Sequence, residues 1–112
     1  MRPRIMQYHK AGVMNSTEKA YAYLLDLQKA NGTIQKYYFE SMKLSIGKNC
    51  GYTPDFMVVN SSGELEFHEV KGGFWRDDAR VKIKACADKY PFIFKGYTLK
   101  SGKWIEEDFT VR

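Results

Sequence analysis

Cysteine is scarce in this sequence, and long apolar runs are absent. The 112 residues include two cysteines, Cys50 and Cys86, which are far apart and form no CxxC pair. This spacing excludes a cysteine-type zinc motif and a small disulfide scaffold, so we expect two free thiols in a reducing compartment. No apolar stretch approaches the roughly 18 residues of a membrane-spanning helix. No apolar segment follows the basic start Met1–Arg4, so we expect no signal peptide, no membrane partner and a cytoplasmic protein.

Acidic residues are fewer than basic ones, 13 against 18, which gives a net charge of +5. A basic surface favours anionic partners, with nucleic acid first, although the charge can also serve solubility alone. Hydrophobic residues make up 44% of the chain, which excludes a disordered protein. At this length we expect one domain over residues 1–112, with a basic N-terminal arm over residues 1–14.

Apolar spacing and turn residues predict the order helix, three strands, helix, two strands. This order predicts an α/β-class fold, more narrowly an α+β fold with a central mixed sheet flanked by helices. The expected elements cover residues 16–30, 34–46, 52–59, 64–71, 77–89, 92–99 and 104–111. In the second helix we expect Asp77-Asp78 to supply the N-cap, with Val81, Ala85 and Cys86 facing inward.

The two middle strands have a register that the loop between them predicts. A three-residue loop ending in Gly63, in the left-handed conformation, is a common hairpin connection. It pairs Asn60 with Glu64, and counting outwards then places Asp55 opposite Glu69. Like charges that face each other destabilise a sheet, and a cation between them removes that penalty. We therefore expect a metal ion between Asp55 and Glu69.

The residues Pro54-Asp55 and, after a gap of thirteen residues, Glu69-Val70-Lys71 form the pattern PD-(D/E)xK. The chain thereby resembles the PD-(D/E)xK nuclease superfamily, which includes restriction endonucleases, Holliday-junction resolvases and recombination exonucleases. The resemblance covers roughly residues 15–95, with a Glu-bearing helix, a "PDF" strand and an "EVKG" strand. In detail the chain looks most like a small uncharacterised phage-encoded family related to phage and archaeal junction resolvases. It implies a restriction-endonuclease-like core.

The resemblance implies roles for individual residues. Asp55 and Glu69 would bind Mg²⁺, with Mn²⁺ as a substitute, together with the backbone carbonyl of Val70. Lys71 would orient the attacking water and stabilise the charge that develops on the phosphate. Glu18 matches the helical glutamate that completes the acidic site. Its alternative role is local, because Asn15 and Glu18 also fit a helix capping box.

Basic and aromatic residues follow the predicted metal-binding strand. The cations are Arg76, Arg80, Lys82 and Lys84, which form either a DNA-binding face or a solvated surface. Phe74 and Trp75 could stack on an unpaired base or belong to the core. His68 alternates to the opposite face from Glu69, where we expect a packed or surface histidine and not a ligand.

Together these features predict a Mg²⁺-dependent DNA endonuclease that selects branched or junction DNA, in phage DNA processing or recombination inside a bacterial cell. Junction resolvases of the superfamily act as dimers, so the resemblance implies a homodimer. The alternatives are a nuclease acting on single strands or ends, and a non-catalytic nucleic-acid-binding protein with the same fold.

Overall fold

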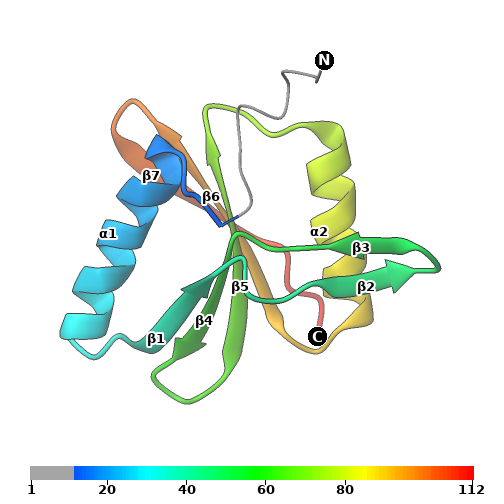
Figure 1. The fold of residues 1–112 in the computed structure, drawn as a ribbon, viewed down its shortest axis with the longest axis horizontal. Helices are drawn as coiled ribbons and strands as arrows, with labels where there is room; N and C mark the ends of the chain where they lie inside the picture. Colours follow the sequence, from blue (N-terminus) through cyan, green and yellow to red (C-terminus); the bar gives the residue numbers. More distant parts are fainter. Residues whose placement is uncertain (1–11) are drawn as a thin grey trace.

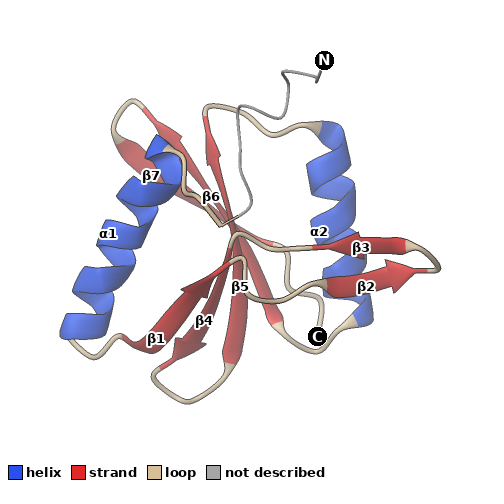
Figure 2. Cartoon of the chain, viewed as in Figure 1, coloured by secondary structure: helices blue, strands red, loops and turns tan. Residues whose placement is uncertain are grey.

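The computed structural model describes residues 12–112, which leaves most of the predicted basic arm outside the described part. These residues form two helices and seven strands: α1 Ser16–Ala30, β1 Ile34–Phe39, β2 Leu44–Gly47, β3 Cys50–Tyr52, β4 Phe56–Asn60, β5 Leu65–Gly72, α2 Asp77–Lys89, β6 Ile93–Lys100 and β7 Lys103–Asp108. Neither helix is long and apolar enough to cross a bilayer. Figure 2 separates the helices, strands and loops by colour.

A five-stranded sheet forms the centre of the molecule, in the order β1-β4-β5-β6-β7. Only β5 and β6 run parallel, and α2 connects them, as a parallel pair requires a long crossover. The prediction of a mixed sheet flanked by helices is confirmed. The helices α1 and α2 lie on opposite sides of the sheet, and the β2–β3 hairpin lies on the side of α2 (Figure 1).

Alternation along the strands divides the core into two layers. Phe56 and Val58 on β4 pack under α1, against Leu25. On the other face Phe67 packs under α2, against Ile83. All five side chains are almost completely buried. The strands in the middle of the sheet are therefore apolar on both faces, which makes the acidic residues at their ends stand out.

The predicted register of the β4–β5 hairpin is confirmed. Val59 pairs with Leu65 and Met57 with Phe67, as the loop geometry predicted. Gly63 has a φ of 86°, and its amide donates to the carbonyl of Asn60 at 2.9 Å. Continuing this register by one pair beyond Phe56 and His68 gives the predicted opposition of residues 55 and 69.

The β2–β3 hairpin was not predicted. The single strand predicted over residues 34–46 instead ends at Phe39, and a separate strand begins at Leu44. Leu44 and Tyr52 are both buried. They pack into the core layer under α2. The tip of the hairpin takes its conformation from Asn49, which has a φ of 56°. Two apolar anchors, and not strand propensity, hold this short element in place.

Two details of α2 were predicted wrongly. The N-cap is Arg76, which makes no side-chain capping bond, and Asp77 and Asp78 are already in the first turn. Carboxylates in that turn favour the helix through its dipole, so they support the helix start without capping it. Val81 is 64% exposed, and Ile83 takes the inward position in its place. Cys86 is buried as predicted.

Candidate active site

Three acidic residues lie in one row across β1, β4 and β5. The β1–β4 register pairs Phe39 with Phe56, so Glu40 is the next residue after that pair and lies opposite Asp55. The amide of Glu40 donates to the carbonyl of Asp55 at 2.8 Å. On the other side of Asp55 the hairpin register brings Glu69. Glu40 was not among the predicted site residues. It lies within the strand predicted over residues 34–46 and directly follows the observed β1.

The first turn of α1 brings Glu18 to the same place. A Cβ atom on Gly72, at the end of β5, would lie 2.8 Å from Oγ1 of Thr17, so the helix start approaches this strand closely. Glu18 is only 4% exposed. Glu18, Glu40 and Asp55 each offer one carboxylate oxygen within 4.8 Å of the others. In Figure 2 the loops that precede α1, follow β1 and precede β4 converge at the centre of the view.

Glu18 also forms the capping box that the sequence offered as its alternative role. Its amide donates to Oδ1 of Asn15 at 2.8 Å, and its Oε1 accepts from the amide of Asn15 at 2.9 Å. Glu18 therefore forms the helix cap and also lies near Asp55, so the two predicted positions are compatible. The hydrogen bonds of the cap fix the carboxyl group at the helix start, beside Asp55.

At the point where β4 and β5 separate, the carboxylate of Asp55 takes the place of a backbone carbonyl as a hydrogen-bond acceptor. Its Oδ2 accepts the amide of Val70 at 2.8 Å. Burial, together with the charges of Glu69 and Glu18, raises the pKa of Asp55 to about 8, against the lowering effects of the Val70 amide and Lys71. The ionised form of Asp55 is therefore unfavourable unless a positive charge joins it.

Glu69 is directed towards two donors. Its Oε1 accepts a hydrogen bond from the hydroxyl of Tyr52, and its Oε2 lies 3.2 Å from Nζ of Lys71. Glu69 is outside the close group formed by Glu18, Glu40 and Asp55. The expected direct opposition of two acids thus becomes a wider site, in which Glu69 acts on Asp55 through its charge. Tyr52 was not predicted as a site residue.

An open pocket of about 460 Å³ joins these groups. It is lined by residues from α1, from the start of β4 and from the end of β5: Asn15, Thr17, Glu18, Asp55, Val70, Lys71 and Gly72. Four of these are predicted catalytic or metal-binding residues: Glu18, Asp55, Val70 and Lys71. The remaining residue of that predicted set, Glu69, does not line the pocket and is 6% exposed.

The four cations near α2 are placed differently from one another. Arg80 donates two hydrogen bonds to Glu107, at 2.9 and 2.7 Å, and its guanidinium lies 5.3 Å from the ring centre of Trp75. Arg76 is largely exposed, with Nε 3.8 Å from Oδ1 of Asp78. The other two, Lys82 and Lys84, are exposed on α2. Arg80 is thus committed to a structural ion pair, while the lysines face solvent.

His68 is a packed residue, as predicted. It is 4% exposed and faces α1, where its Nδ1 lies 2.7 Å from the hydroxyl of Tyr21. Its Nε2 lies 2.9 Å from Oε1 of Glu66. Burial lowers the pKa of His68, against the raising effect of Glu66. It belongs to the opposite face of the sheet from Lys71.

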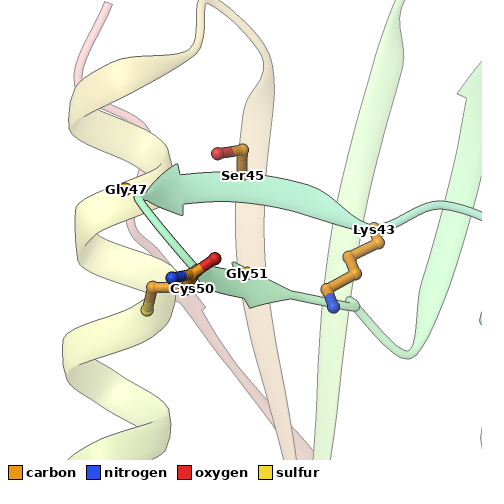
Figure 3. A pocket seen from close by; sticks show the side chains of 6 residues that line it. Lys43, Ser45, Gly47, Cys50 and Gly51 are labelled. Atoms are coloured by element: carbon orange, nitrogen blue, oxygen red, sulfur yellow. The ribbon is translucent and has the colours of Figure 1, made fainter.

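A separate pocket of about 440 Å³ opens on the β2–β3 hairpin (Figure 3). Its lining includes Lys43, Ser45 and Cys50, and it contains no carboxylate. Cys50 is an exposed free thiol, and Cys86 is a buried one, as the sequence predicted. This pocket therefore lacks the ligand groups that gather at Asp55.

Comparison with known proteins gives little for function. No protein-family model and no curated protein matches the chain. A solved structure described as "Crystal structure of SSO0001" aligns with a TM-score of 0.49 and 12% identity, over 83% of this chain and 50% of that one. The chain spans about half the length of that protein. The function is therefore argued from the site itself.

Proposed function

We propose that this protein is a metal-dependent DNA endonuclease of the PD-(D/E)xK type that cleaves branched or junction DNA. The observation that supports it most is the meeting of Glu18, Glu40 and Asp55 within 4.8 Å. Glu18 and Asp55 line an open pocket together with Lys71, which contacts Glu69. Carboxylates at this distance and largely shielded from water repel one another unless a cation joins them. The resemblance to junction resolvases supports branched DNA as the substrate and a homodimer as the working form.

The residues fit a hard divalent cation. All the available ligand atoms are oxygens, from Glu18, Glu40, Asp55 and the carbonyl of Val70, which suits Mg²⁺ and Mn²⁺ and not a soft metal. Asp55 is also the residue whose pKa is raised most clearly among the acids, to about 8. When bound, Mg²⁺ supplies Lewis-acid activation of the phosphate and a water of lowered pKa.

The residues of the chain have complementary tasks in this proposal. Lys71 lines the pocket, and its ammonium group is available to a phosphate oxygen and to the attacking water. Glu69 holds Lys71 through the 3.2 Å contact, and Tyr52 holds Glu69. The water oxygen attacks phosphorus, the bond from phosphorus to the 3′-oxygen breaks, and the products carry a 5′-phosphate and a 3′-hydroxyl.

The exposed cations of α2 would neutralise DNA phosphates around the cut. Lys82 and Lys84 have no partner role comparable with that of Arg80, and their side chains face solvent. Contacts of this kind position the duplex without reading its sequence. The proposed working location is the cytoplasm of a bacterial cell that carries a phage.

A non-catalytic DNA-binding protein is the main rival, and the acidic pocket argues against it. Without a cation, Glu18, Glu40 and Asp55 would repel the phosphates that such a protein must hold. A nuclease acting on single strands or ends would use the same site. Only the DNA substrates that it cleaves distinguish it from a junction nuclease.

The test is incubation of the protein with linear, nicked, flapped and four-way DNA in Mg²⁺, in Mn²⁺ and in EDTA. We expect cleavage with either metal, greatest on branched DNA, and none in EDTA. Asp55→Asn should abolish cleavage and keep DNA binding, whereas Asp88→Asn, at an exposed acid of α2, should cut like the wild type. Absence of cleavage on every substrate, or full activity in Asp55→Asn, would contradict the proposal.

A further inference from the structure

Phe74 is the most exposed large hydrophobic side chain among residues 12–112, at 76%. Leaving a Phe ring in water forgoes about 1.5–3 kcal/mol of burial. Its neighbours are nevertheless fixed. The amide of Gly73 donates to the carbonyl of Leu99 at 3.2 Å, and Nε1 of Trp75 donates to Oγ1 of Thr98 at 2.9 Å. The ring is thus held outwards by an anchored backbone, and its exposure calls for a partner.

Trp75, in contrast, is occupied within the fold. Its indole lies over Gly96 of β6, where a Cβ atom would collide with the ring, and it packs 5.5 Å from the ring of Phe109. Arg80 covers it from the side of α2. The sequence placed Phe74 and Trp75 together as aromatics that could stack on a base. In the structure Trp75 packs against the fold, and Phe74 is the one of the two whose ring is largely exposed.

Phe74 borders a pocket of about 350 Å³ whose other walls are partly apolar. Ile105, 52% exposed, and the indole of Trp75 line it together with Thr98 and Lys100. The carboxylate of Glu107, which also lines it, is paired with Arg80. Its volume falls in the range of roughly 300–1,000 Å³ typical of small-ligand sites. An exposed ring, an aliphatic side chain and a lysine suit a flat aromatic group joined to an anion.

The pocket at Phe74 adjoins the acidic pocket. Lys71 and Gly72 line the acidic pocket, and the next residue, Gly73, lines the pocket at Phe74. Gly73 has a φ of 104°, a conformation that turns the chain sharply between the two. A strand with one phosphate beside Lys71 would therefore bring its neighbouring nucleotide to Phe74.

We propose that the pocket at Phe74 receives an unpaired nucleobase of the DNA strand that is cleaved, next to the phosphate at the acidic site. The inference rests on the proposed function and narrows its substrate. A base paired within a continuous duplex stays stacked and cannot enter. The preferred substrate therefore carries an unpaired nucleotide beside the cut, as flaps and junctions do. Stacking on an aromatic side chain tolerates any base, so no sequence preference follows.

The test measures binding and not cleavage, with the full chain and with Ca²⁺ in place of Mg²⁺. Ca²⁺ binds oxygen ligands of the same kind and neutralises the acidic residues. The probes are a fully paired duplex and a flapped duplex that carries 2-aminopurine at its first unpaired position. Phe74→Ala should weaken binding of the flap by roughly 5- to 150-fold and leave duplex binding unchanged. In the wild-type complex the 2-aminopurine emission should be quenched by stacking, and Phe74→Ala should restore it.

Two further variants serve as controls. Phe74→Trp keeps a stacking ring and should bind the flap like the wild type. Tyr23→Ala removes an aromatic side chain that is 66% exposed on α1 and should change neither probe. Equal losses for flap and duplex, no loss in Phe74→Ala, or unquenched 2-aminopurine would each overturn the inference, as would a failure of the wild type to bind the flap.

Binding and cleavage distinguish this inference from the proposed function. If the wild type cuts no DNA in Mg²⁺ but binds the flap through Phe74, the nuclease proposal fails and the base pocket stands. If the wild type cuts DNA and Phe74→Ala keeps the same substrate preference and flap affinity, the base pocket fails and the nuclease proposal stands.

Discussion

The hydroxyl of Tyr52 donates a hydrogen bond to Oε1 of Glu69, and both residues are buried. Tyr52 comes from the β2–β3 hairpin, which lies outside the main sheet. Burial and the charge of Glu69 raise the pKa of Tyr52, so the hydroxyl keeps its proton and remains a donor. Lys71 binds the other oxygen of the same carboxylate. The hairpin therefore helps to fix an acid of the candidate active site.

Replacement of Tyr52 by Phe should reduce both stability and metal binding. A buried carboxylate oxygen would lose its donor, which costs about 1–3 kcal/mol in the free energy of unfolding. A less constrained Glu69 should also raise, several-fold, the Mg²⁺ concentration needed to increase the melting temperature by half its maximum. Urea unfolding measures the first effect, and thermal unfolding across a Mg²⁺ series measures the second.

Tyr90→Phe is the matched control for this prediction. Its hydroxyl donates to the carbonyl of Ser45 at 2.7 Å, on the surface and away from the acids. That variant should leave the Mg²⁺ dependence unchanged. If Tyr52→Phe also leaves it unchanged, Tyr52 supports the fold without positioning Glu69.

Two substitutions of Glu18 separate its roles at the helix start and in the acidic site. Glu18→Gln keeps an oxygen that accepts from the amide of Asn15, because a capping box works with Glu or Gln. It should fold as stably as the wild type in EDTA and lose stabilisation by Mg²⁺ and cleavage. Glu18→Ala loses the cap as well and should be less stable by about 1 kcal/mol.

Circular dichroism during thermal unfolding, with and without Mg²⁺, checks both variants of Glu18. Equal Mg²⁺ responses of Glu18→Gln and the wild type would restrict Glu18 to capping. A capping role alone would also leave the cleavage rate of Glu18→Gln intact.

The site should make the stability of the metal-free protein depend on pH. The pKa of Asp55 is about 8 in the folded chain, against 3.8 for the free side chain, so the folded state binds more protons between these values. The free energy of unfolding therefore falls as pH rises through that window and levels off above it. The side chain of Asp55→Asn does not ionise, so this variant should lack that pH dependence. Saturating Mg²⁺ favours the ionised form of Asp55 and should weaken the pH dependence of the wild type.

The measurement is the melting temperature of Asp55→Asn minus that of the wild type, in EDTA. This difference should grow steadily from pH 5 to pH 8. Subtraction removes the contribution of His68, whose lowered pKa acts in the opposite sense and is common to both proteins. In saturating Mg²⁺ the difference should shrink or change sign. A difference independent of pH would show that the buried carboxyl group is already compensated within the chain.

The contrast between Glu69 and Glu40 shows how much of the site could be predicted from the sequence. Asp55 and Glu69 belong to one hairpin, so a single loop, ending at Gly63, fixes their register. Glu40 reaches the site through pairing of β1 with β4, and the β2–β3 hairpin separates these strands in the sequence. No local pattern encodes that pairing, because it depends on how the whole sheet assembles.

Tyr52 and Phe74 illustrate the same limit for aromatic residues. In the sequence each is an aromatic residue next to a strand end. Only the assembled fold makes Tyr52 a buried donor and Phe74 an exposed ring. Trp75 takes the space over Gly96 of β6, so the adjacent Phe74 stays outside. The mixed sheet and the two helices were predictable because their periodic patterns are local.

The cations of α2 should differ in their effects on DNA binding. Lys82 faces solvent, and Lys82→Ala should lower DNA affinity for all sequences alike and reduce the slope of log affinity against log salt by about 1. Its melting temperature should remain that of the wild type, since an exposed lysine changes stability by less than about 0.5 kcal/mol. Arg80→Ala removes two hydrogen bonds to Glu107 and the cover over Trp75, so it should lower the melting temperature.

Salt titrations of DNA binding, read by fluorescence anisotropy, together with thermal unfolding, distinguish the two cations. If Arg80→Ala reduces the salt slope by as much as Lys82→Ala at unchanged stability, its ion pair with Glu107 opens on DNA and Arg80 contacts phosphate. If neither variant changes the slope, α2 is a solvated face. DNA would then be held by other parts of the chain, such as the residues of α1 and β5 that line the acidic pocket.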